Sequence, residues 1–595
     1  MLDILQYPFD SEQILKKRKS IKKALLSDKS NRIKKKVAVL GGSTTHDVIQ
    51  AMDLFLLNSG IEAEFYQSEY GRYWEDVMFG NDALNKFEPD IIYIHTNIRN
   101  IIKFPSIYHT QDDITALLEV TFSHFEQMWN KIVERKRDCI IIQNNFEYPS
   151  YRVLGNKEAY DIHGKISFIN QLNELFYKYA REHNNFFIQD INYLAGCYGL
   201  DKWSDSYYWH MYKYALNIQA IPALAFNIAN IVKSIYGKNK KALVMDLDNT
   251  LWGGVVGDDG VDNLQIGSET SIGQAYSEFQ SYLKELKSMG ILLNINSKNE
   301  EANAIAALNH PDSKLSVEDF IVIKANWEPK SKNLLEIANE LNILPDSLVF
   351  VDDNPAEREI VRQQIDGVSI PEIGSVEEYI RIIDKSGFFE VTNLSEDDKK
   401  RNDMYRENIQ RLKLKNVFSN YREYLLSLEM ESIIKPFESI YVSRIAQLTN
   451  KSNQFNLTTR RYSQAEIEEI GASSDYISIY GRLIDKFGDN GIVSVVIGRV
   501  EEDVCHIDLW LMSCRVLKRD MEYAMMDELV QRCKERGVYT IMGYFYPTTK
   551  NNMVCEFYKE QGFHQISRYE SGNTVWSFHI EDSYINKNTV IKVER

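Results

Sequence analysis

Two carboxylates two residues apart follow an apolar stretch near the middle of the chain. Residues 241–260 read KALVMDLDNTLWGGVVGDDG, so Asp246 ends a predicted buried strand and Asp248 follows it, ahead of a glycine-rich turn. Side chains alternate along extended backbone, which puts the two acids on one side. Carboxylates this close repel one another unless a cation lies between them, and Mg²⁺ prefers hard oxygen ligands. The spacing therefore predicts a divalent-metal site.

Three later segments bring polar groups to the same edge of the predicted sheet. The strand ILLNIN leads to Ser297, the helix start WEPKSKN supplies Lys330, and the strand LVFV leads to Asp352 and Asp353. Ligands of parallel sheets bind outside the carboxyl ends of the strands. We therefore expect one site that combines two pairs of acids with a hydroxyl and an ammonium group.

This ordered set resembles the haloacid dehalogenase (HAD) superfamily of phosphoryl-transfer enzymes, whose signatures are a DxDx[TV] loop, a strand-end Ser or Thr, a Lys and a terminal acidic pair. The resemblance implies that Asp246 attacks phosphorus and that Asp248 protonates the leaving oxygen and later activates water. Ser297 and Lys330 would bind the non-bridging oxygens. The implied Mg²⁺ ligands are Asp246, the main-chain carbonyl of Asp248, and Asp352 or Asp353.

Five segments resemble FkbH-like proteins (HAD subfamily IIIC) more specifically: DLDNTLWGGVVGDDG, NSKNEEANAIAAL, FIVIKANWEPKSKNL, VFVDDNPAERE and KSNQFNLTTRRY. The resemblance covers about residues 240–595, with weaker similarity towards the N-terminus. Well-known members take a glyceryl unit from 1,3-bisphosphoglycerate, remove phosphate, and load the acyl group onto an acyl carrier protein. The resemblance implies a small phosphorylated acid as substrate, a carrier protein as partner, Mg²⁺ as cofactor, and phosphopantetheine or coenzyme A as the source of the thiol.

One position departs from those loaders. They commonly have Cys immediately before the strand-end Ser, whereas this chain has Asn296, which cannot form a thioester. No cysteine lies between Cys197 and Cys505. The acyl group is then passed directly, or carried by a thiol of another domain, of which Cys514 is the nearest by motif, or the chain is a plain phosphatase for a different acid.

The turn after the first acids is too short for a large cap. Between Asp248 and the next predicted helix lies WGGVVGDDGVDNLQIG, enough for a flap or hairpin, so an open site for a bulky or protein-carried substrate is expected. A small-molecule phosphatase closed by its neighbouring domains is the alternative. The expected substrate contacts here are Thr250, Trp252, Gly253, Gly254, Asn296, Lys298 and Asn299.

From Val37 the sequence alternates strands and amphipathic helices, which predicts a parallel α/β sheet of flavodoxin-like size. Its first strand ends in GGSTTHDV, which resembles the GDSxT turn of SGNH hydrolases. The resemblance implies Ser43 as nucleophile, Asn97 in an oxyanion hole, and Asp205 with His210 as the rest of a catalytic set. A Gly replaces the usual Asp before Ser43 and the acid-to-His spacing is longer, so a degenerate scaffold is the alternative.

From about Tyr421 an α+β pattern resembles the GNAT acyltransferase fold. There a loop between strand and helix, here residues 514–521, presents amides to the pyrophosphate of coenzyme A. The resemblance implies Arg515, Lys518 and Arg519 as phosphate contacts and Asn551, with Tyr558, near the thioester. A helix cap and a packed aromatic are the alternatives for the last two. FkbH-like relatives usually have glycines where this chain has Lys518 and Asp520.

Length and composition bound the remaining possibilities. The chain has 595 residues, so we expect several domains, and its 44% hydrophobic residues are ordinary for a soluble protein. Its net charge of −16 disfavours affinity for nucleic acid. Six scattered cysteines, no apolar run approaching about 18 residues and no secretion signal favour the cytoplasm. The basic segment 16–36 is expected to be a solvated helix, with a docking arm for an acidic partner as the alternative. The expected order is a basic arm (1–36), an SGNH-like domain (37–236), a HAD phosphatase-like domain (237–390), a linker helix (391–420) and a GNAT-like domain (421–595).

Overall fold

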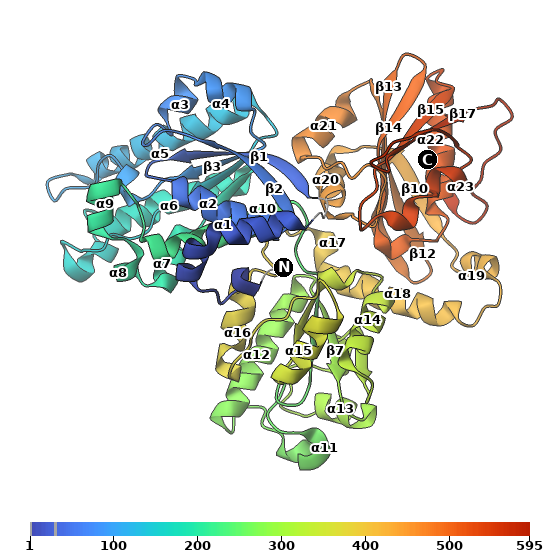
Figure 1. The fold of residues 1–595 in the computed structure, drawn as a ribbon, viewed down its shortest axis with the longest axis horizontal. Coiled ribbons are helices and arrows are strands. Elements are labelled where there is room, and N and C mark those ends of the chain that lie inside the picture. The colour runs from blue at the N-terminus through green and yellow to red at the C-terminus, as the bar shows by residue number, and fades with distance from the viewer. Residues whose placement is uncertain (1–2, 29–31, 595) are drawn as a thin grey trace. The chain divides into compact units, whose positions relative to one another are not determined.

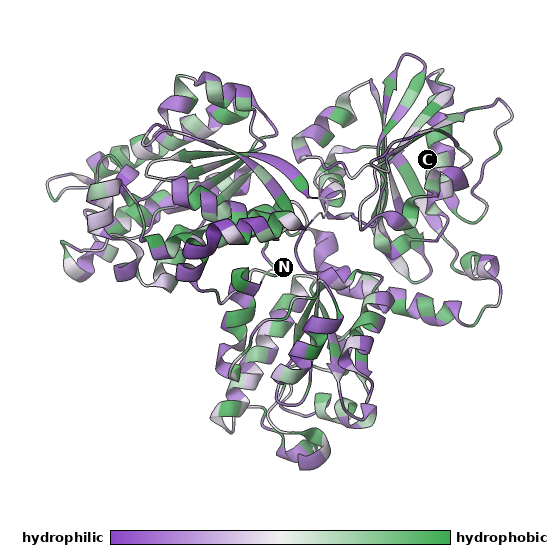
Figure 2. Cartoon of the chain, viewed as in Figure 1, coloured by the Kyte–Doolittle hydropathy of each residue, from purple (hydrophilic) through white to green (hydrophobic). Residues whose placement is uncertain are grey.

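The computed structural model describes residues 3–28 and 32–594, so part of the predicted basic arm, residues 29–31, lies outside the described residues. The chain divides into two compact units, Met1–Ile235 and Tyr236–Arg595. Each unit builds its own sheets (Figure 1). Apolar residues line the strands and the inner faces of the helices (Figure 2), as expected when sheet faces are covered by amphipathic helices.

The first unit is a five-stranded parallel sheet in the order β2-β1-β3-β4-β5, which confirms the predicted flavodoxin-like layout. The inner strands β3 and β4 are mostly apolar and buried, as expected when both faces are covered, whereas β2 at the edge carries Glu62 and Glu64. Residues of β3, β4, α5 and α6 share one core cluster, and α2 packs against α10 elsewhere in the unit. The main elements are β1 (Ile33–Gly41), α2 (His46–Asn58), β2 (Ile61–Gln67), β3 (Ile91–His95), α5 (Gln111–Arg135), β4 (Ile140–Asn144), α6 (Lys165–Glu182), β5 (Phe186–Gln189) and α10 (Ile221–Ile235).

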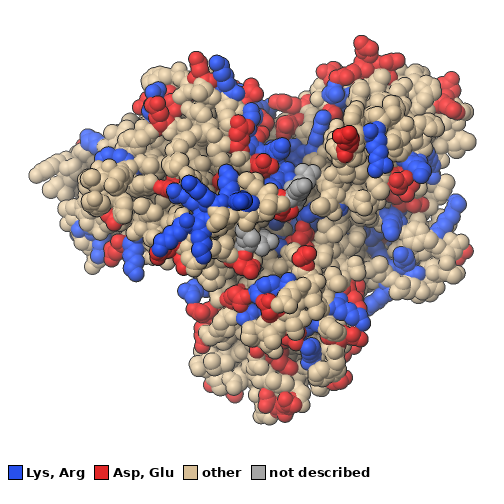
Figure 3. All heavy atoms as spheres, in the orientation of Figure 1, with Lys and Arg blue, Asp and Glu red and all other residues tan. Residues whose placement is uncertain are grey.

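The predicted basic helix is α1 (Ser11–Ser27), which begins after the N-cap Asp10. Its apolar face, Ile14, Ile21 and Leu25, is buried, and it packs against α2 and α10. Lysines on the other face form a blue patch in Figure 3. Arg18 pairs with Asp47 of α2 at 2.7 Å. The segment is thus a surface helix of the first unit up to Ser27.

One helical stretch, Ile218–Ile235, is long and apolar enough to cross a membrane by length and composition alone. This qualifies the expectation that no segment approaches that length. In the structure 56% of this stretch is buried inside the protein, and α10 packs against α1 and α2. Its apolar character matches a core position in the first unit.

The second unit begins with a four-stranded parallel sheet in the order β8-β7-β6-β9. Alternate residues of β6 point to opposite faces, so Leu243 and Met245 join one core cluster and Ala242 and Val244 another. The first cluster includes α12, α13 and α16, and the second includes α14 and α15. The bounds are β6 (Ala242–Met245), α12 (Ser271–Ser288), β7 (Leu292–Ser297), α13 (Glu301–Leu308), β8 (Val322–Ala325), α14 (Lys330–Glu340), β9 (Leu348–Val351), α15 (Pro355–Gln364) and α16 (Val376–Lys385).

Three helices lead to the last sheet: α17 (Glu396–Lys399), α18 (Arg401–Lys415) and α19 (Tyr421–Ser427). The sheet is mixed, in the order β16-β17-β15-β14-β13-β12-β10-β18, with β11 paired to β14, which confirms the α+β class. It lies in the same compact unit as the parallel sheet, so a separate domain from residue 421 stays a prediction. Its elements are β10 (Glu431–Pro436), α20 (Val442–Lys451), β11 (Phe455–Asn456), α21 (Gln464–Ala472), β12 (Tyr476–Asp485), β13 (Gly488–Glu501), β14 (Val504–Met512), α22 (Met521–Glu535), β15 (Thr540–Phe545), α23 (Phe557–Glu560), β16 (His564–Arg568), β17 (Thr574–His579) and β18 (Lys592–Glu594).

Candidate active site

The predicted acids, hydroxyl and ammonium group lie at one edge of the parallel sheet in the second unit. Asp246 follows β6 directly, and Asp352 and Asp353 follow the neighbouring strand β9. Ser297 is the buried last residue of β7, on the other side of β6. Lys330 is the first residue of α14. Parallel strands end at a common edge, and this brings together residues up to about a hundred positions apart in the chain.

Lys330 bridges two of the acids. Its Nζ lies 2.7 Å from an oxygen of Asp246 and 2.5 Å from an oxygen of Asp352, and the lysine is only 3% exposed. Burial pulls the pKa of Lys330 down, but the two carboxylates outweigh burial and raise it. The ammonium group is therefore held charged inside the site.

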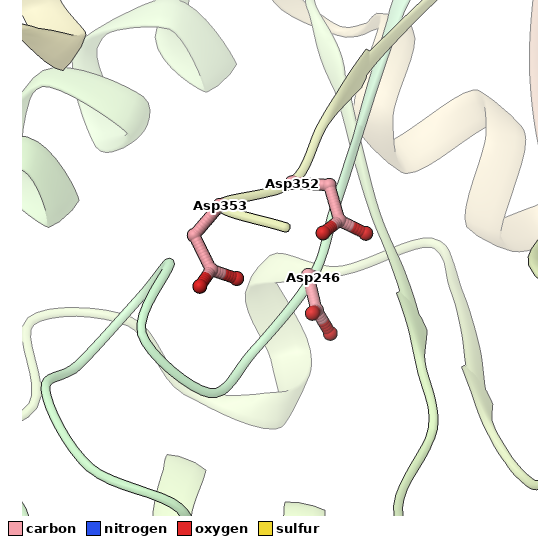
Figure 4. A group of neighbouring side chains, drawn as sticks. All are labelled: Asp246, Asp352 and Asp353. Atoms are coloured by element: carbon pink, nitrogen blue, oxygen red, sulfur yellow. The ribbon is translucent and has the colours of Figure 1, made fainter. Parts of the chain in front are cut away.

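Three carboxylates gather beside this lysine. One oxygen each of Asp246, Asp352 and Asp353 can be chosen so that all lie within 4.8 Å of one another, and the three side chains converge in Figure 4. Burial raises the pKa of Asp352 to about 6, although Lys330 opposes the shift. A cluster of acidic oxygens that repel one another suits a hard divalent cation. This donor set fits Mg²⁺.

The carboxylate of Asp248 does not join that cluster, and its main-chain carbonyl, the ligand that the resemblance implies, stays a prediction. The carboxylate oxygens instead accept hydrogen bonds from Trp252 Nε1 at 2.9 Å, from the main-chain amide of Val256 at 3.1 Å and from Asn299 Nδ2 at 3.0 Å. Burial nevertheless raises its pKa. A fixed carboxyl group that retains its proton more readily than usual suits a general acid.

The glycine-rich turn folds back as a short hairpin beside Asp248. Gly253 and Gln265 exchange main-chain hydrogen bonds of 3.0 and 2.8 Å, and Trp252 is buried below the hairpin. Gly254 has φ +100°, and an added Cβ would lie 2.9 Å from Asp259. Thr250 is buried and accepts a hydrogen bond from the amide of Asp353. Residues 250–254 thus support the acids, and the structure does not place Thr250 or Trp252 at an open surface for substrate.

The residues around Ser297 that are expected to contact substrate each have a partner within the protein. The buried amide group of Asn296 donates from Nδ2 to the main-chain carbonyl of Lys330 at 2.8 Å, away from the acids. Lys298 pairs with Glu357 at 2.6 Å, and Asn299 holds Asp248. All three side chains make contacts within the protein, and their roles as substrate contacts stay predictions.

One residue of the site was not predicted. Arg358, in the DDNPAERE segment, donates from Nη1 to the main-chain carbonyls of Asp352 and Asp353 at 2.7 and 2.9 Å. It is buried and also pairs with Glu372. The sequence signal that could have found Arg358 is its distance from Pro355, where the helix starts, because helical side chains in the first turn point back towards the N-terminus of the helix.

The nucleophile turn of the first unit keeps Ser43 inside the protein. Ser43 is 1% exposed, and among the described residues its Oγ has no hydrogen-bond partner. Asn97 is also buried, accepts from the amide of Arg99 at 2.9 Å and donates to Asn100 at 3.0 Å. Asn100 lies where a side chain at Gly42 would clash, 2.3 Å from an ideal Cβ. Asn97 therefore caps a turn, and Ser43 is closed to solvent.

The predicted partners of Ser43 are elsewhere engaged. Asp205 is the N-cap of α9 (Ser206–Tyr212) and accepts from the amides of Tyr207 and Tyr208 at 2.8 and 3.3 Å. His210 is exposed on that helix. Within the described residues no side-chain hydrogen bond joins Ser43, Asp205 and His210. The catalytic set expected from the SGNH resemblance is not assembled.

The loop before α22 retains part of the basic character predicted for it. Lys518 is exposed at φ +63°, and Asp520 has φ +60°, the backbone conformation that favours the glycines of FkbH-like relatives. Arg515 is half-buried, with its Nε 3.2 Å from Ser513 Oγ. Arg519 is buried and paired with Asp485 at 3.2 Å, so it is not free to bind a phosphate.

Asn551 and Tyr558 are also structural. Asn551 is fully buried, accepts from the amide of Thr548 at 2.7 Å and donates to the carbonyls of Asn456 and Tyr546 at 2.9 and 3.0 Å. Tyr558 is packed against Gly543, where an added Cβ would lie 2.3 Å from its ring. Tyr558 agrees with the alternative of a packed aromatic, whereas the side chain of Asn551 accepts no hydrogen bond from the helical turn that follows it, so the alternative of a helix cap is not borne out.

The space between β14 and β15 is filled by the segment 455–458. These parallel strands pair only from Val504 to His506 and from Thr540 to Met542. Beyond that point β11 pairs with Leu511 and Met512, and the next residue, Leu457, bonds both to Trp510 of β14 and to Tyr546, which follows β15. The chain itself therefore occupies the gap where the strands diverge.

Comparisons with known proteins agree with this arrangement. Residues 36–233 match the family described as FkbH, N-terminal domain. The N-terminal part of protein BF1531 from Bacteroides fragilis, solved with Mg and described as containing a phosphatase domain, is 29% identical; the match covers 63% of this chain and 99% of that one, with a TM-score of 0.58. No curated protein matches the chain.

Several acetyltransferase structures align more weakly. The ribosomal-protein-S18-alanine N-acetyltransferase of Escherichia coli is 13% identical over 27% of this chain and 99% of its own, with a TM-score of 0.21. The PaiA N-acetyltransferase of Thermoplasma acidophilum, solved with coenzyme A, is 12% identical over 25% of this chain and 99% of its own, with a TM-score of 0.19. Alignments this low carry no argument about function. The acid cluster beside Lys330, the match over residues 36–233 and the similarity to BF1531 together support the resemblance of the chain to FkbH-like proteins.

Proposed function

We propose that the second unit is a HAD-type, Mg²⁺-dependent phosphatase acting on a phosphorylated small acid. The observation that carries this proposal is the buried Lys330, which touches Asp246 and Asp352 beside a three-carboxylate cluster. Asp246 thus lies beside both a fixed ammonium group and a cluster that can bind a metal ion. Positive charges placed in this way can neutralise the negative charge of a phosphoryl group. The similarity to an Mg-bound phosphatase domain supports it.

The chain's own groups divide the work. Asp246 attacks phosphorus, and the P–O bond to the leaving group breaks as the aspartyl phosphate forms. Asp248, held by Trp252 and Asn299, gives its proton to the leaving oxygen and then takes one from the water that hydrolyses the intermediate. Lys330 and Ser297 bind the non-bridging oxygens. Bound Mg²⁺ would be held by Asp246, Asp352 and Asp353 and would neutralise charge on the phosphoryl group.

We further propose that an acyl group of the same acid is passed to the thiol of a carrier protein or of coenzyme A. The two steps must act on different bonds. Attack of Asp246 on the phosphorus of an acyl phosphate would release a free carboxylate and lose the activated acyl group. Thiol attack on the carbonyl carbon instead forms the thioester and expels phosphate. A substrate with both an acyl phosphate and a phosphate ester accommodates both reactions, with Asp246 acting on the ester.

The test incubates the full chain with Mg²⁺, a bisphosphorylated acid and a phosphopantetheinylated carrier. Phosphate release and the intact mass of the carrier are measured in the same reaction. In the Asp246→Asn variant, we expect the carrier to gain the phosphorylated acyl group or nothing, and never the dephosphorylated one. A dephosphorylated acyl-carrier made by that variant at the wild-type rate would refute the role of Asp246.

A plain phosphatase is the second candidate. Asn296 favours it, because its amide is turned away from the acids and bonded to Lys330, so no thiol or other acyl acceptor stands beside Ser297. This candidate predicts many turnovers of a phosphomonoester without any thiol. We also propose a cytoplasmic location, which the six free cysteines support.

A further inference from the structure

Two buried asparagines lie on the same face of β7, two residues apart. Asn294 and Asn296 are both fully buried, which is unusual for a side chain with two donors and an acceptor. Buried amides are retained only when their hydrogen bonds are made. The partners of each amide therefore show which part of the structure it stabilises.

Asn294 serves the sheet. Its Nδ2 lies 3.1 Å from the carbonyl of Leu292 and 3.4 Å from that of Leu243, and its Oδ1 accepts from the amide of Val322 at 3.2 Å. These partners belong to β6, β7 and β8. None of these three hydrogen bonds is made with an acid of the site or with α14.

Asn296 instead connects the sheet to α14. Its Nδ2 donates to the carbonyl of Lys330, the first residue of the helix, at 2.8 Å. Its Oδ1 accepts from Asn333 Nδ2 at 3.1 Å, and the same Asn333 nitrogen donates to Asn326 in the loop before the helix at 2.9 Å. Both ends of the first turn of α14 are thus tied to the end of β7.

The first turn of α14 requires such a tie. A cation at the N-terminus of a helix is opposed by the helix dipole, and Lys330 also loses its hydration in a buried position. The lysine side chain is flexible, so its ammonium group stays near Asp246 and Asp352 only if its own backbone is fixed.

We propose that Asn296 is a positioning residue: it clamps the first turn of α14 so that the Lys330 ammonium group meets Asp246 and Asp352. The inference rests on the proposed phosphatase function and deepens it. A thiol at this position would be a weak donor and could not make both contacts. With Asn at residue 296 the chain has no acyl-carrying thiol at this position, but the position of Lys330 is fixed.

The test compares Asn296→Leu with Asn294→Leu in the full chain. Both changes remove a fully buried amide from the same strand face, so their costs in folding stability are matched. We expect Asn296→Leu to lower kcat for phosphate release from a phosphomonoester about 10- to 100-fold at saturating Mg²⁺, with KM changed less than about threefold. Asn294→Leu is expected to retain kcat within about twofold per folded molecule.

Hydrogen exchange supplies a reading that does not need activity. We expect faster amide exchange in the first turn of α14 in Asn296→Leu than in Asn294→Leu. Equal kcat and equal exchange in the two variants would overturn the proposal. If the wild type releases no phosphate, the proposed function fails while the exchange result still decides the clamp. Should Asn296→Leu not fold, Asn296→Cys removes the same amide, and a Cys variant with the wild-type kcat would also overturn the proposal.

Discussion

Replacing Lys330 by Met tests the electrostatic design of the acid site. The change keeps the length and apolar stem of the side chain and removes one positive charge. In the wild type this charge lies 2.7 Å from Asp246 and 2.5 Å from Asp352. Asp352 is fully buried, so water cannot replace the lost partner.

The magnitude follows from burial. Removing one partner of a buried ion pair costs about 3–5 kcal/mol, because the remaining charges stay desolvated and unpaired. We expect this loss in unfolding free energy of the second unit when Mg²⁺ is chelated. A bound divalent cation supplies the missing positive charge to the same carboxylates. Mg²⁺ should therefore bind the variant more tightly, and a tenfold gain in affinity would return about 1.4 kcal/mol.

The assay is urea unfolding at about pH 8, above the raised pKa of Asp352, in chelator and in excess Mg²⁺. Lys332→Met is the matched control, because Lys332 is exposed and pairs with an equally exposed Glu328. Its effect should stay below about 1 kcal/mol in both buffers. A deficit of Lys330→Met that is the same with and without Mg²⁺ would show that the lysine and the metal do not share these carboxylates.

Three further changes probe other parts of the chain. In the first unit Glu147 is 4% exposed, and burial raises its pKa from 4.5 to about 7, so the stability of the wild type falls as the pH rises between these values. Thermal unfolding should show Glu147→Gln to be as stable as the wild type at about pH 4 and about 3 kcal/mol more stable than it at about pH 8. Gly254→Ala, at φ +100°, should destabilise the second unit by about 1–3 kcal/mol in urea, and an unchanged midpoint would contradict the strain argument. Arg519→Met should cost about 1–3 kcal/mol, because it removes a buried hydrogen bond to Asp485 while Arg411 still pairs with that carboxylate. The exposed Lys518→Met should cost less than about 0.5 kcal/mol, and the opposite ranking would return Arg519 to a binding role.

The acids of the site were predictable because their signal is local. Asp246 and Asp352 each follow an apolar strand, and the ends of parallel strands share one edge whatever the loops between them do. Lys330 was placed by the same logic at a helix start. The parallel arrangement of both sheets likewise follows from the alternation of strands and helices.

The direction of the neighbouring side chains was not predictable. Whether Asn296 faces the acids or α14 depends on the partners that fold around it, namely Lys330 and Asn333, which lie more than thirty residues away. Spacing alone likewise does not reveal the hydrogen bond from Trp252 that holds the Asp248 carboxylate outside the acid cluster.

The predicted sites outside the parallel sheet of the second unit failed for a different reason. Ser43 and Asn551 sit in motifs of the right composition, but burial removes them from solvent, and burial is set by segments distant in the chain. A motif specifies which residue types are present, whereas access to a ligand depends on what packs over them.

The segment 455–458 also bears on how the last sheet can come apart. β14 and β15 share three paired positions, so β15, β17 and β16 are joined to the rest of the sheet by these positions, by the inserted segment and by Asn551. The attachment of β15, β17 and β16 therefore depends in part on a segment that lies some eighty residues earlier in the chain. If the segment 455–458 lost its contacts, β15, β17 and β16 would separate from the sheet in a local unfolding step, while the parallel sheet that carries the acids stays folded.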